Sequence, residues 1–261
     1  MKKLIYFLMA ALMVVGAISC KKDNSGSNDN DGKVPVPEAV DIGLVVNGKT
    51  IRWASFNLGA SKEYEYGNHY AWGETEPKSN YDWTTYLLAN GNEEKLIAYC
   101  PRNKADYWDS DVKPNGPDGE EKLLPSHDAA HAKLGGEWRM PTLEEFEALL
   151  ALKEDTDNYD CNFWALVIDE NGNEIRDANG DVVHGFRITQ KSTGNSIFFP
   201  AAGYYLQERL HQTAAEGSYW SSTLDTDNPS DAFYVCFQPA DAYSVSYPRV
   251  YGRSIRPVCV E

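Results

Sequence analysis

The segment from Gly135 to Lys153 constrains the fold more than any other part of the chain, because it carries a complete set of helix-start signals. Pro141 favours an extended backbone at Met140, so a short strand or loop ends there. Thr142 is a strong N-cap residue, and Glu145, three positions later, completes a capping box. The sequence therefore predicts that a helix begins directly after Thr142.

The predicted helix has one apolar face and spans about three turns. The apolar residues that recur at helical spacing are Leu143, Phe146, Leu149 and Leu150. Trp138, which precedes the helix, is expected to point into a core. None of these side chains is chemically reactive, so the segment is a folding signature and any function must come from elsewhere.

The N-terminus has the pattern of a secretory signal peptide over residues 1–19. Lys2 and Lys3 precede an apolar run that ends at Ile18, just before Cys20. The small residues before this cysteine resemble a bacterial lipobox. That resemblance implies cleavage before Cys20 and lipid attachment to it, whereas the alternative is an ordinary signal peptide with an incidental cysteine.

Residues 20–37 are rich in Lys, Asp, Asn, Ser and Gly, a composition that cannot bury enough apolar surface to fold, so we expect a flexible tether. Its Lys-Lys-Asp start partly resembles the surface-export tract of Bacteroidetes lipoproteins. Residues 38–261 are then expected to form a single domain. After removal of Lys2 and Lys3 from the 24 basic residues, 22 remain against 39 acidic ones, a net charge of −17. Nucleic acid and anionic membrane surfaces are therefore unsuitable partners.

The order of expected elements favours an α+β fold. Asn47-Gly48 is a hairpin signal between strand-like runs at 39–46 and 50–55. A short helix is expected between His127 and Gly135, before the capped helix. Several strand-like runs follow, at residues 162–168, 184–189, 196–200, 218–224, 232–238, 244–247 and 254–260.

Two insertions are expected in this domain. Residues 76–125 contain many aromatic residues but no sustained period, which indicates a packed irregular segment. Residues 169–183 contain two similar Asp-x-Asn-Gly heptads. A calcium-binding EF-hand needs glycine at the sixth loop position, where Glu174 and Val182 stand, so hairpin turns are the better interpretation and only a loose calcium site is left open.

Short motifs along the domain together resemble a known family. They are Val40-Asp-Ile-Gly-Leu, Arg52-Trp-Ala-Ser-Phe-Asn-Leu-Gly-Ala, Tyr70-Ala-Trp-Gly-Glu-Thr-Glu-Pro-Lys, Asp128-Ala-Ala-His, Gly136-Glu-Trp-Arg-Met-Pro-Thr, Asn195-Ser-Ile-Phe-Phe-Pro-Ala-Ala-Gly-Tyr, Tyr219-Trp-Ser-Ser and Gly252-Arg-Ser-Ile-Arg-Pro-Val. In this order they resemble the Fibrobacter succinogenes major paralogous domain family of secreted Bacteroidetes proteins.

The resemblance implies a C-type lectin-like fold, shared with formylglycine-generating enzymes. Such a fold has two helices, twisted antiparallel sheets, N- and C-terminal strands paired side by side, and long irregular loops. The calcium-binding motifs of true C-type lectins are not matched. Formylglycine-generating enzymes use a reactive cysteine pair that binds copper, and Cys236 and Cys259 do not stand in matching surroundings, so no cofactor is expected.

Four cysteines follow Cys20, and in an exported chain they permit two disulfides. Cys236 and Cys259 lie in late strand-like runs and are the preferred pair, with buried thiols as the alternative. His127 and His131 have the spacing of a zinc-binding pair. The glutamate base, a third ligand and a long helix are missing, so no metal site is expected.

Aromatic residues crowd the last third of the chain and provide the candidate contact surface. Trp53, Trp138 and Trp220 lie in family motifs and are expected in the core. The tyrosines beside loops are the candidates for stacking against a sugar ring or gripping a peptide, namely Tyr204, Tyr205, Tyr243 and Tyr247.

These features predict a cell-envelope lipoprotein, anchored by lipid to the outer membrane and exposed at the surface if the export tract acts. Its expected function is that of a non-catalytic binding or adhesion module for a glycan or a protein. The alternatives are a structural subunit of a surface assembly and an oxidase-like enzyme related to formylglycine-generating enzymes. No catalytic residue is marked out by spacing, because the chain has no nucleophile elbow, phosphate loop or zinc-cysteine motif.

Overall fold

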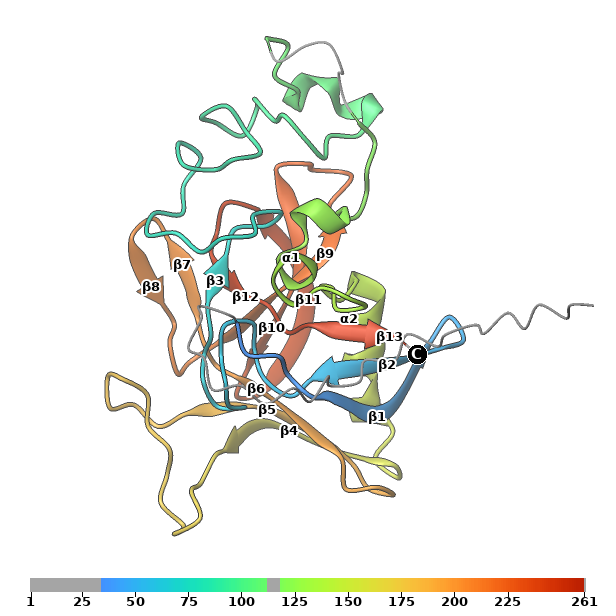
Figure 1. The fold of residues 1–261 in the computed structure, drawn as a ribbon, viewed down its shortest axis with the longest axis vertical. Helices are drawn as coiled ribbons and strands as arrows, with labels where there is room; N and C mark the ends of the chain where they lie inside the picture. The colour runs from blue at the N-terminus through green and yellow to red at the C-terminus, as the bar shows by residue number, and fades with distance from the viewer. Residues whose placement is uncertain (1–33, 112–117, 261) are drawn as a thin grey trace, which may run out of the picture.

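The structure, a computed structural model, describes residues 34–111 and 118–260. The expected signal peptide, the lipid-bearing Cys20 and residues 21–33 of the tether lie outside the described residues. The described part is α+β, with several antiparallel sheets and few helices (Figure 1). None of the helices in these two ranges is both long and apolar enough to span a membrane.

The first sheet has three strands in the order β1-β2-β13. Its strands are β1 (Ala39–Val46), β2 (Lys49–Ala54) and β13 (Val258–Val260). Asn47 and Gly48 join β1 to β2 with positive φ values of 51° and 74°, which is the two-residue turn that the sequence predicts.

The C-terminal strand joins the sheet of the N-terminal hairpin, but its direct partner is β2. The expectation that the two terminal strands lie side by side is therefore wrong in detail. Val258 pairs with Trp53 of β2. The β1–β2 register shifts between Asp41 and Val45, so β1 is locally irregular, whereas β2 offers a regular second edge.

The second sheet has five strands in the order β11-β10-β9-β12-β3 and is antiparallel except for the β9–β12 pair. Its strands are β3 (His69–Tyr70), β9 (Gly217–Leu224), β10 (Asp231–Gln238), β11 (Asp241–Pro248) and β12 (Arg253–Ser254). The predicted run at 254–260 is thus divided into two strands, β12 and β13, in different sheets.

A third sheet and a separate hairpin complete the strands. The sheet is formed by β4 (Tyr159–Leu166), β5 (His184–Gln190) and β6 (Ser196–Pro200), and it lies at the bottom of Figure 1. The hairpin consists of β7 (Tyr204–Leu206) and β8 (Arg209–His211). Tyr205 of β7 bridges to Gly252 next to β12, so the hairpin lies against the five-stranded sheet.

The helices are α1 (Ala129–Leu134), α2 (Leu143–Ala151) and the 3-10 helices η1 (Arg102–Tyr107), η2 (Pro125–His127) and η3 (Leu152–Glu154). Helix α2 begins directly after Thr142, as predicted, and α1 lies within the expected range from His127 to Gly135, whereas η1, η2 and η3 were not predicted. The hydroxyl of Thr142 accepts from the Glu145 amide at 3.2 Å, and a Glu145 carboxylate oxygen accepts from the Thr142 amide at 2.8 Å. The predicted capping box is therefore confirmed.

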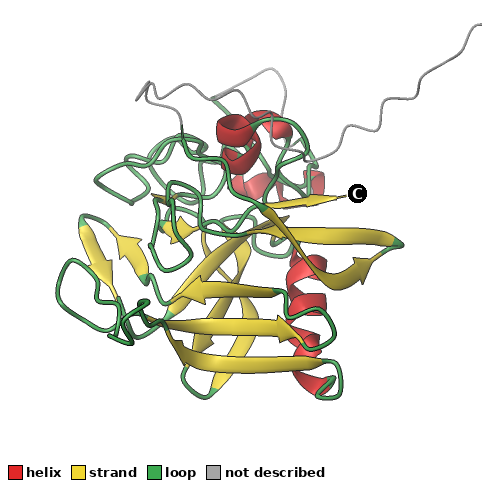
Figure 2. Ribbon diagram, turned by 60° about the horizontal axis from the view of Figure 1, so that its bottom comes forward, coloured by secondary structure: helices red, strands yellow, loops and turns green. Residues whose placement is uncertain are grey.

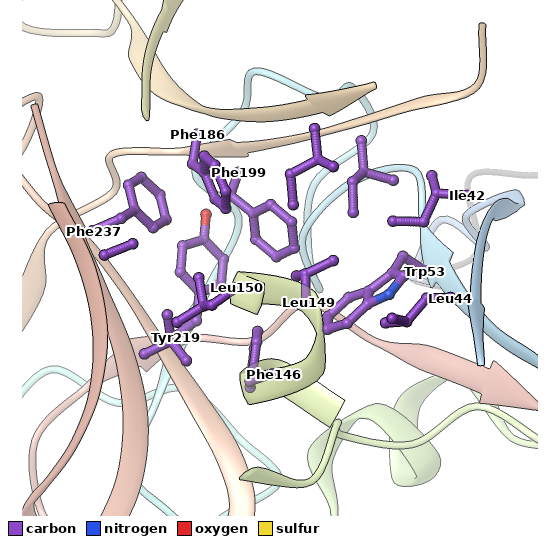
Figure 3. Close-up of a cluster of buried hydrophobic side chains, with 14 of the residues drawn as sticks. Ile42, Leu44, Trp53, Phe146, Leu149, Leu150, Phe186, Phe199, Tyr219 and Phe237 are labelled. Atoms are coloured by element: carbon purple, nitrogen blue, oxygen red, sulfur yellow. The ribbon is translucent and has the colours of Figure 1, made fainter. Parts of the chain in front are cut away.

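Helix α2 lies along one side of the strands and contributes its apolar face to the main core (Figures 2 and 3). Phe146 of α2 packs against Trp53 with ring centroids 5.3 Å apart, and Trp53 in turn packs edge-on against Phe199 at 5.6 Å. Trp138, also expected in the core, is 6% exposed and packs in a smaller cluster with Ala54.

The described residues of the 76–125 insertion, 76–111 and 118–125, lie in the loops at the top of Figure 1 and are packed, as the aromatic content predicts. Tyr81, Tyr86 and Tyr99 are almost completely buried in a second apolar cluster. The insertion at residues 169–183 forms two successive hairpin turns, in which Asp169 and Asp177 each accept two backbone N–H groups. The predicted turns are confirmed.

Candidate functional site

The candidate site lies on the face of the five-stranded sheet that points away from α2. Successive side chains of a strand point to opposite faces. In β10, Val235 and Phe237 belong to the main core beneath α2, whereas Tyr234 and Cys236 belong to the second cluster on the other face. The sheet therefore separates a core of aliphatic and aromatic residues from a face that is rich in tyrosine.

Arg253 is the centre of this second face. Its side chain is buried, and its guanidinium carbon lies 3.4 Å from the Tyr234 ring centroid and 4.9 Å from that of Trp220. The guanidinium also donates to the hydroxyl of Ser218. Burial lowers the pKa of Arg253, but a guanidinium stays charged at neutral pH, so a cation is held under the surface by aromatic faces.

Three tyrosine rings continue outward from this cation. The ring centroids of Tyr204, Tyr247 and Tyr251 lie 5.3 to 5.8 Å from the Arg253 guanidinium carbon. The Tyr251 ring contacts both others, at 5.7 Å from Tyr204 and 5.1 Å from Tyr247. Tyr204 comes from β7 and Tyr247 from β11, so tertiary packing joins residues that are distant in the sequence.

Tyr243 extends the same surface along β11. It lies four residues before Tyr247, and β10 and β11 pair without a bulge, so both side chains point to one face of the sheet. Tyr243 is 42% exposed and Tyr247 is 44% exposed, whereas Tyr204 and Tyr251 are half-buried. We refer to Tyr204, Tyr243, Tyr247 and Tyr251 as the tyrosine surface.

Tyr205, the fourth tyrosine singled out from the sequence, does not belong to the tyrosine surface. Alternation along β7 turns it away from Tyr204, and its ring stacks on Tyr81 at 5.3 Å and contacts His69 edge-on at 5.1 Å. It therefore helps to hold the hairpin against the insertion at 76–125. The expectation that it shares a contact surface with the other three is wrong.

The hydroxyl groups of Tyr204, Tyr243 and Tyr251 stay protonated at neutral pH, because the pKa of each is raised. Burial raises the pKa of Tyr251 to about 12, and burial together with the negative charge of Glu216 raises the pKa of Tyr204. A hydrogen bond with the Cys236 thiol raises the pKa of Tyr243. A protonated phenol can both donate and accept, so the surface combines apolar ring faces with neutral hydrogen-bonding groups.

The thiol of Cys236 lies beneath Tyr243 and is not an activated nucleophile, because burial raises its pKa to about 12. The expected disulfide to Cys259 is not formed. Cys236 lies in β10 of the five-stranded sheet, whereas Cys259 lies in β13 of the first sheet, and the two belong to different apolar clusters.

The histidine pair does not form a metal site. His127 lies in η2, where its Nδ1 is 2.7 Å from the Tyr99 hydroxyl, and His131 lies in α1, where its Nδ1 is 3.3 Å from the Trp138 carbonyl oxygen. Across residues 34–111 and 118–260, no group of three or more His, Cys, Asp or Glu side chains is arranged to hold a metal ion.

Two central residues of the site were not predicted, namely Tyr251 and Arg253. Arg253 stands in the Gly252-Arg-Ser-Ile-Arg motif, where a buried cation would not be expected, because lone arginines are rarely buried. The signal available in the sequence was the group of tyrosines that precedes this motif at positions 243, 247 and 251.

Comparison with known protein families gives a match to part of the chain. The model of a family described as a domain of unknown function (DUF8237) matches residues 185–258, which extend from β5 to the start of β13 and include the whole tyrosine surface and Arg253. Neither the curated proteins nor the solved structures contain a match to this chain.

Proposed function

We propose that this protein is a non-catalytic binding module whose ligand, a glycan or another protein, docks on the tyrosine surface. The observation that carries the proposal is the contrast in exposure within one cluster. Tyr243 and Tyr247 leave 42% and 44% of their surface open to solvent, while Arg253 and Trp220 beneath are almost completely buried.

A rigid support of this kind suits recognition. The Tyr251 ring contacts those of Tyr204 and Tyr247, and all three rings pack on the buried Arg253, so little side-chain freedom is lost when a ligand covers them. Tyrosine is also enriched among the residues that contribute most to binding, because it offers a large apolar face together with a hydroxyl group.

We also propose that the domain has a C-type lectin-like fold and is a lipoprotein of the cell envelope, anchored to the outer membrane through Cys20. The fold proposal is supported by the C-terminal strand in the sheet of the N-terminal hairpin, by α1 and α2, and by the long packed loops. The anchor proposal is supported by the signal-like residues 1–19 and the tether-like composition that follows.

The test uses the full chain, purified in detergent, on glycan and protein arrays. Every ligand found is then measured by calorimetry with Tyr247→Ala and Tyr243→Ala. Each substitution should weaken binding about tenfold or more, because each removes an exposed ring from the contact. Tyr107→Ala is the matched control, since Tyr107 is a half-buried tyrosine in η1, within the 76–125 insertion and outside the tyrosine surface.

The proposal fails if no ligand is found on either array. It also fails if a ligand is found whose affinity is the same for the wild type, Tyr243→Ala and Tyr247→Ala. Circular dichroism of all variants verifies that a loss of affinity does not reflect a loss of fold.

A further inference from the structure

A cavity of about 530 Å³ lies next to the tyrosine surface, between the β7–β8 hairpin and the start of the 76–125 insertion. Leu206 is the one apolar side chain in its lining. The other lining residues are polar or charged, namely Asn80, Asp82, Gln207, Glu208, Arg209 and His211. We refer to this cavity as the hairpin groove.

The hairpin groove and the tyrosine surface share one face of the hairpin. In the β7–β8 register, Tyr204 pairs with His211 and Leu206 pairs with Arg209, so these four side chains point the same way. The Tyr204 ring also stacks on the His211 ring, with centroids 5.6 Å apart and an angle of 20° between the planes. His211 lines the groove, so the Tyr204–His211 stack joins the groove to the tyrosine surface.

The wall of the groove opposite the hairpin is held firmly. The backbone of Tyr81 exchanges hydrogen bonds with that of Gln207, at 2.9 Å and 3.0 Å, which fixes Asn80 and Asp82 at the rim. Hydrogen bonding from Thr84 lowers the pKa of Asp82, so this carboxylate is charged at neutral pH. The groove is therefore pre-formed on the side of the insertion as well as on the side of the hairpin.

Asn80 lies in the lining of the groove beside Asp82. Its amide nitrogen donates to Asp82 at 2.9 Å. Its Oδ1 is buried and, within the described part of the chain, has no hydrogen-bond partner.

We infer that the tyrosine surface and the hairpin groove form one elongated site for a glycan chain, with sugar rings stacked on the tyrosines and further sugar units hydrogen-bonded in the groove. The inference rests on the proposed function and names the ligand class for the same site. Only Leu206 is apolar in the groove, whereas its acceptors and donors match a chain of hydroxyl groups.

The charges on the site favour a glycan without acidic groups. Asp82 and Glu208 line the groove, and burial together with the negative charge of Glu216 raises the pKa of Tyr204 in the tyrosine surface. The whole chain has a net charge of −15. An anionic polysaccharide would be repelled by these carboxylates, which outnumber the exposed cation Arg209. We therefore commit to a neutral glycan chain long enough to span both parts.

The experiment measures how affinity depends on chain length. The full chain is titrated by calorimetry with gluco-, xylo-, manno- and chito-oligosaccharides, each from the disaccharide to the hexasaccharide. We expect the hexasaccharide of at least one series to bind about tenfold more tightly than its disaccharide, because only the longer chain reaches the groove.

Two substitutions test the groove without touching the tyrosines. Glu208 and Arg209 are exposed residues, so Glu208→Ala and Arg209→Ala should fold normally. Each should remove most of the length-dependent gain and leave disaccharide affinity unchanged. Arg102→Ala, an exposed arginine in η1, is the matched control.

The outcomes separate the inference from the proposed function. If Tyr247→Ala weakens a ligand but Glu208→Ala and Arg209→Ala affect neither length, the elongated site is overturned and the binding module stands. If no oligosaccharide binds, or if the groove variants weaken a peptide or protein ligand instead, the glycan assignment is overturned. The proposed function itself fails only if neither array yields a ligand whose affinity depends on Tyr243 or Tyr247.

Discussion

Removal of the Trp138 side chain tests whether the segment that precedes α2 is a structural support. Trp138 is 6% exposed and packs in a small cluster with Ala54, Cys259 and the partly buried Leu134, so it is buried but lies outside the main core. It also lines a surface cavity of about 330 Å³, into which water can follow when the indole is removed. Trp53 is the natural comparison, because it is completely buried between Phe146 and Phe199 in the main core.

The structure predicts different losses of stability when each of the two tryptophans is replaced by alanine. Burial of a tryptophan removes about 200 Å² from water, worth about 5 kcal/mol at 25 cal/mol per Å². Trp53→Ala leaves a closed cavity in the core, so its cost should reach this value or exceed it. Trp138→Ala leaves a space that water can fill, so its cost should lie near the lower end of the range for such changes, about 3 kcal/mol.

Urea unfolding followed by far-UV circular dichroism at neutral pH gives the free energy of unfolding of each variant. If Trp53→Ala does not fold, the pair Trp53→Phe and Trp138→Phe provides the same ranking. A Trp138→Ala variant with wild-type stability would refute the supporting role of Trp138. If Trp138→Ala loses as much stability as Trp53→Ala or more, the argument that water fills the space left by Trp138 is refuted.

Two further predictions concern pH. Burial lowers the pKa of His69 from 6.5 to about 4. Between pH 6.5 and pH 4 the unfolded chain therefore binds more protons than the folded protein. As the pH falls through this range, His69 should lower the free energy of unfolding by about 3 kcal/mol. Urea titrations of His69→Gln at pH 7 and pH 4 should lack this loss of stability. If the pH dependence of His69→Gln equals that of the wild type, protonation of His69 is not its cause. Burial, with the charge of Asp225, raises the pKa of Asp231 from 3.8 to about 6, so its ionisation destabilises the fold as pH rises from 4 through 6. Asp231→Asn should therefore stabilise the protein by about 1 kcal/mol at pH 7.5, after discount for solvent screening, and give no gain at pH 4 in thermal melts; a constant gain at both pH values would show that the charge is not the cause.

Local structure was predictable wherever a few residues close together in the sequence determine the backbone conformation or hydrogen-bond to one another. The start of α2 is determined by the reciprocal hydrogen bonds of Thr142 and Glu145, and the β1–β2 turn by the left-handed conformations of Asn47 and Gly48. The same holds for the turns of the 169–183 insertion, where each aspartate bonds to backbone groups within four residues. These contacts do not depend on the rest of the molecule.

The site was predictable only in part. Tyr204, Tyr243 and Tyr247 were identified as contact candidates because they stand beside loops, and the structure leaves them at the surface. Tyr205 has the same local sequence signal, yet it packs inward on Tyr81, because alternation along β7 sends adjacent side chains to opposite sides.

By itself, the sequence determined the α+β class, the capped helix and most strands, because hydrogen-bonding partners and apolar periodicity for these elements are local. Only the tertiary structure decided the strand partners and the site. The choice of β2 as the partner of β13, the separation of Cys236 from Cys259, and the meeting of tyrosines from β7 and β11 around Arg253 all join residues far apart in the chain. Such contacts depend on how whole sheets pack against one another. That packing results from many weak contacts between buried side chains, and no single position in the sequence reveals it.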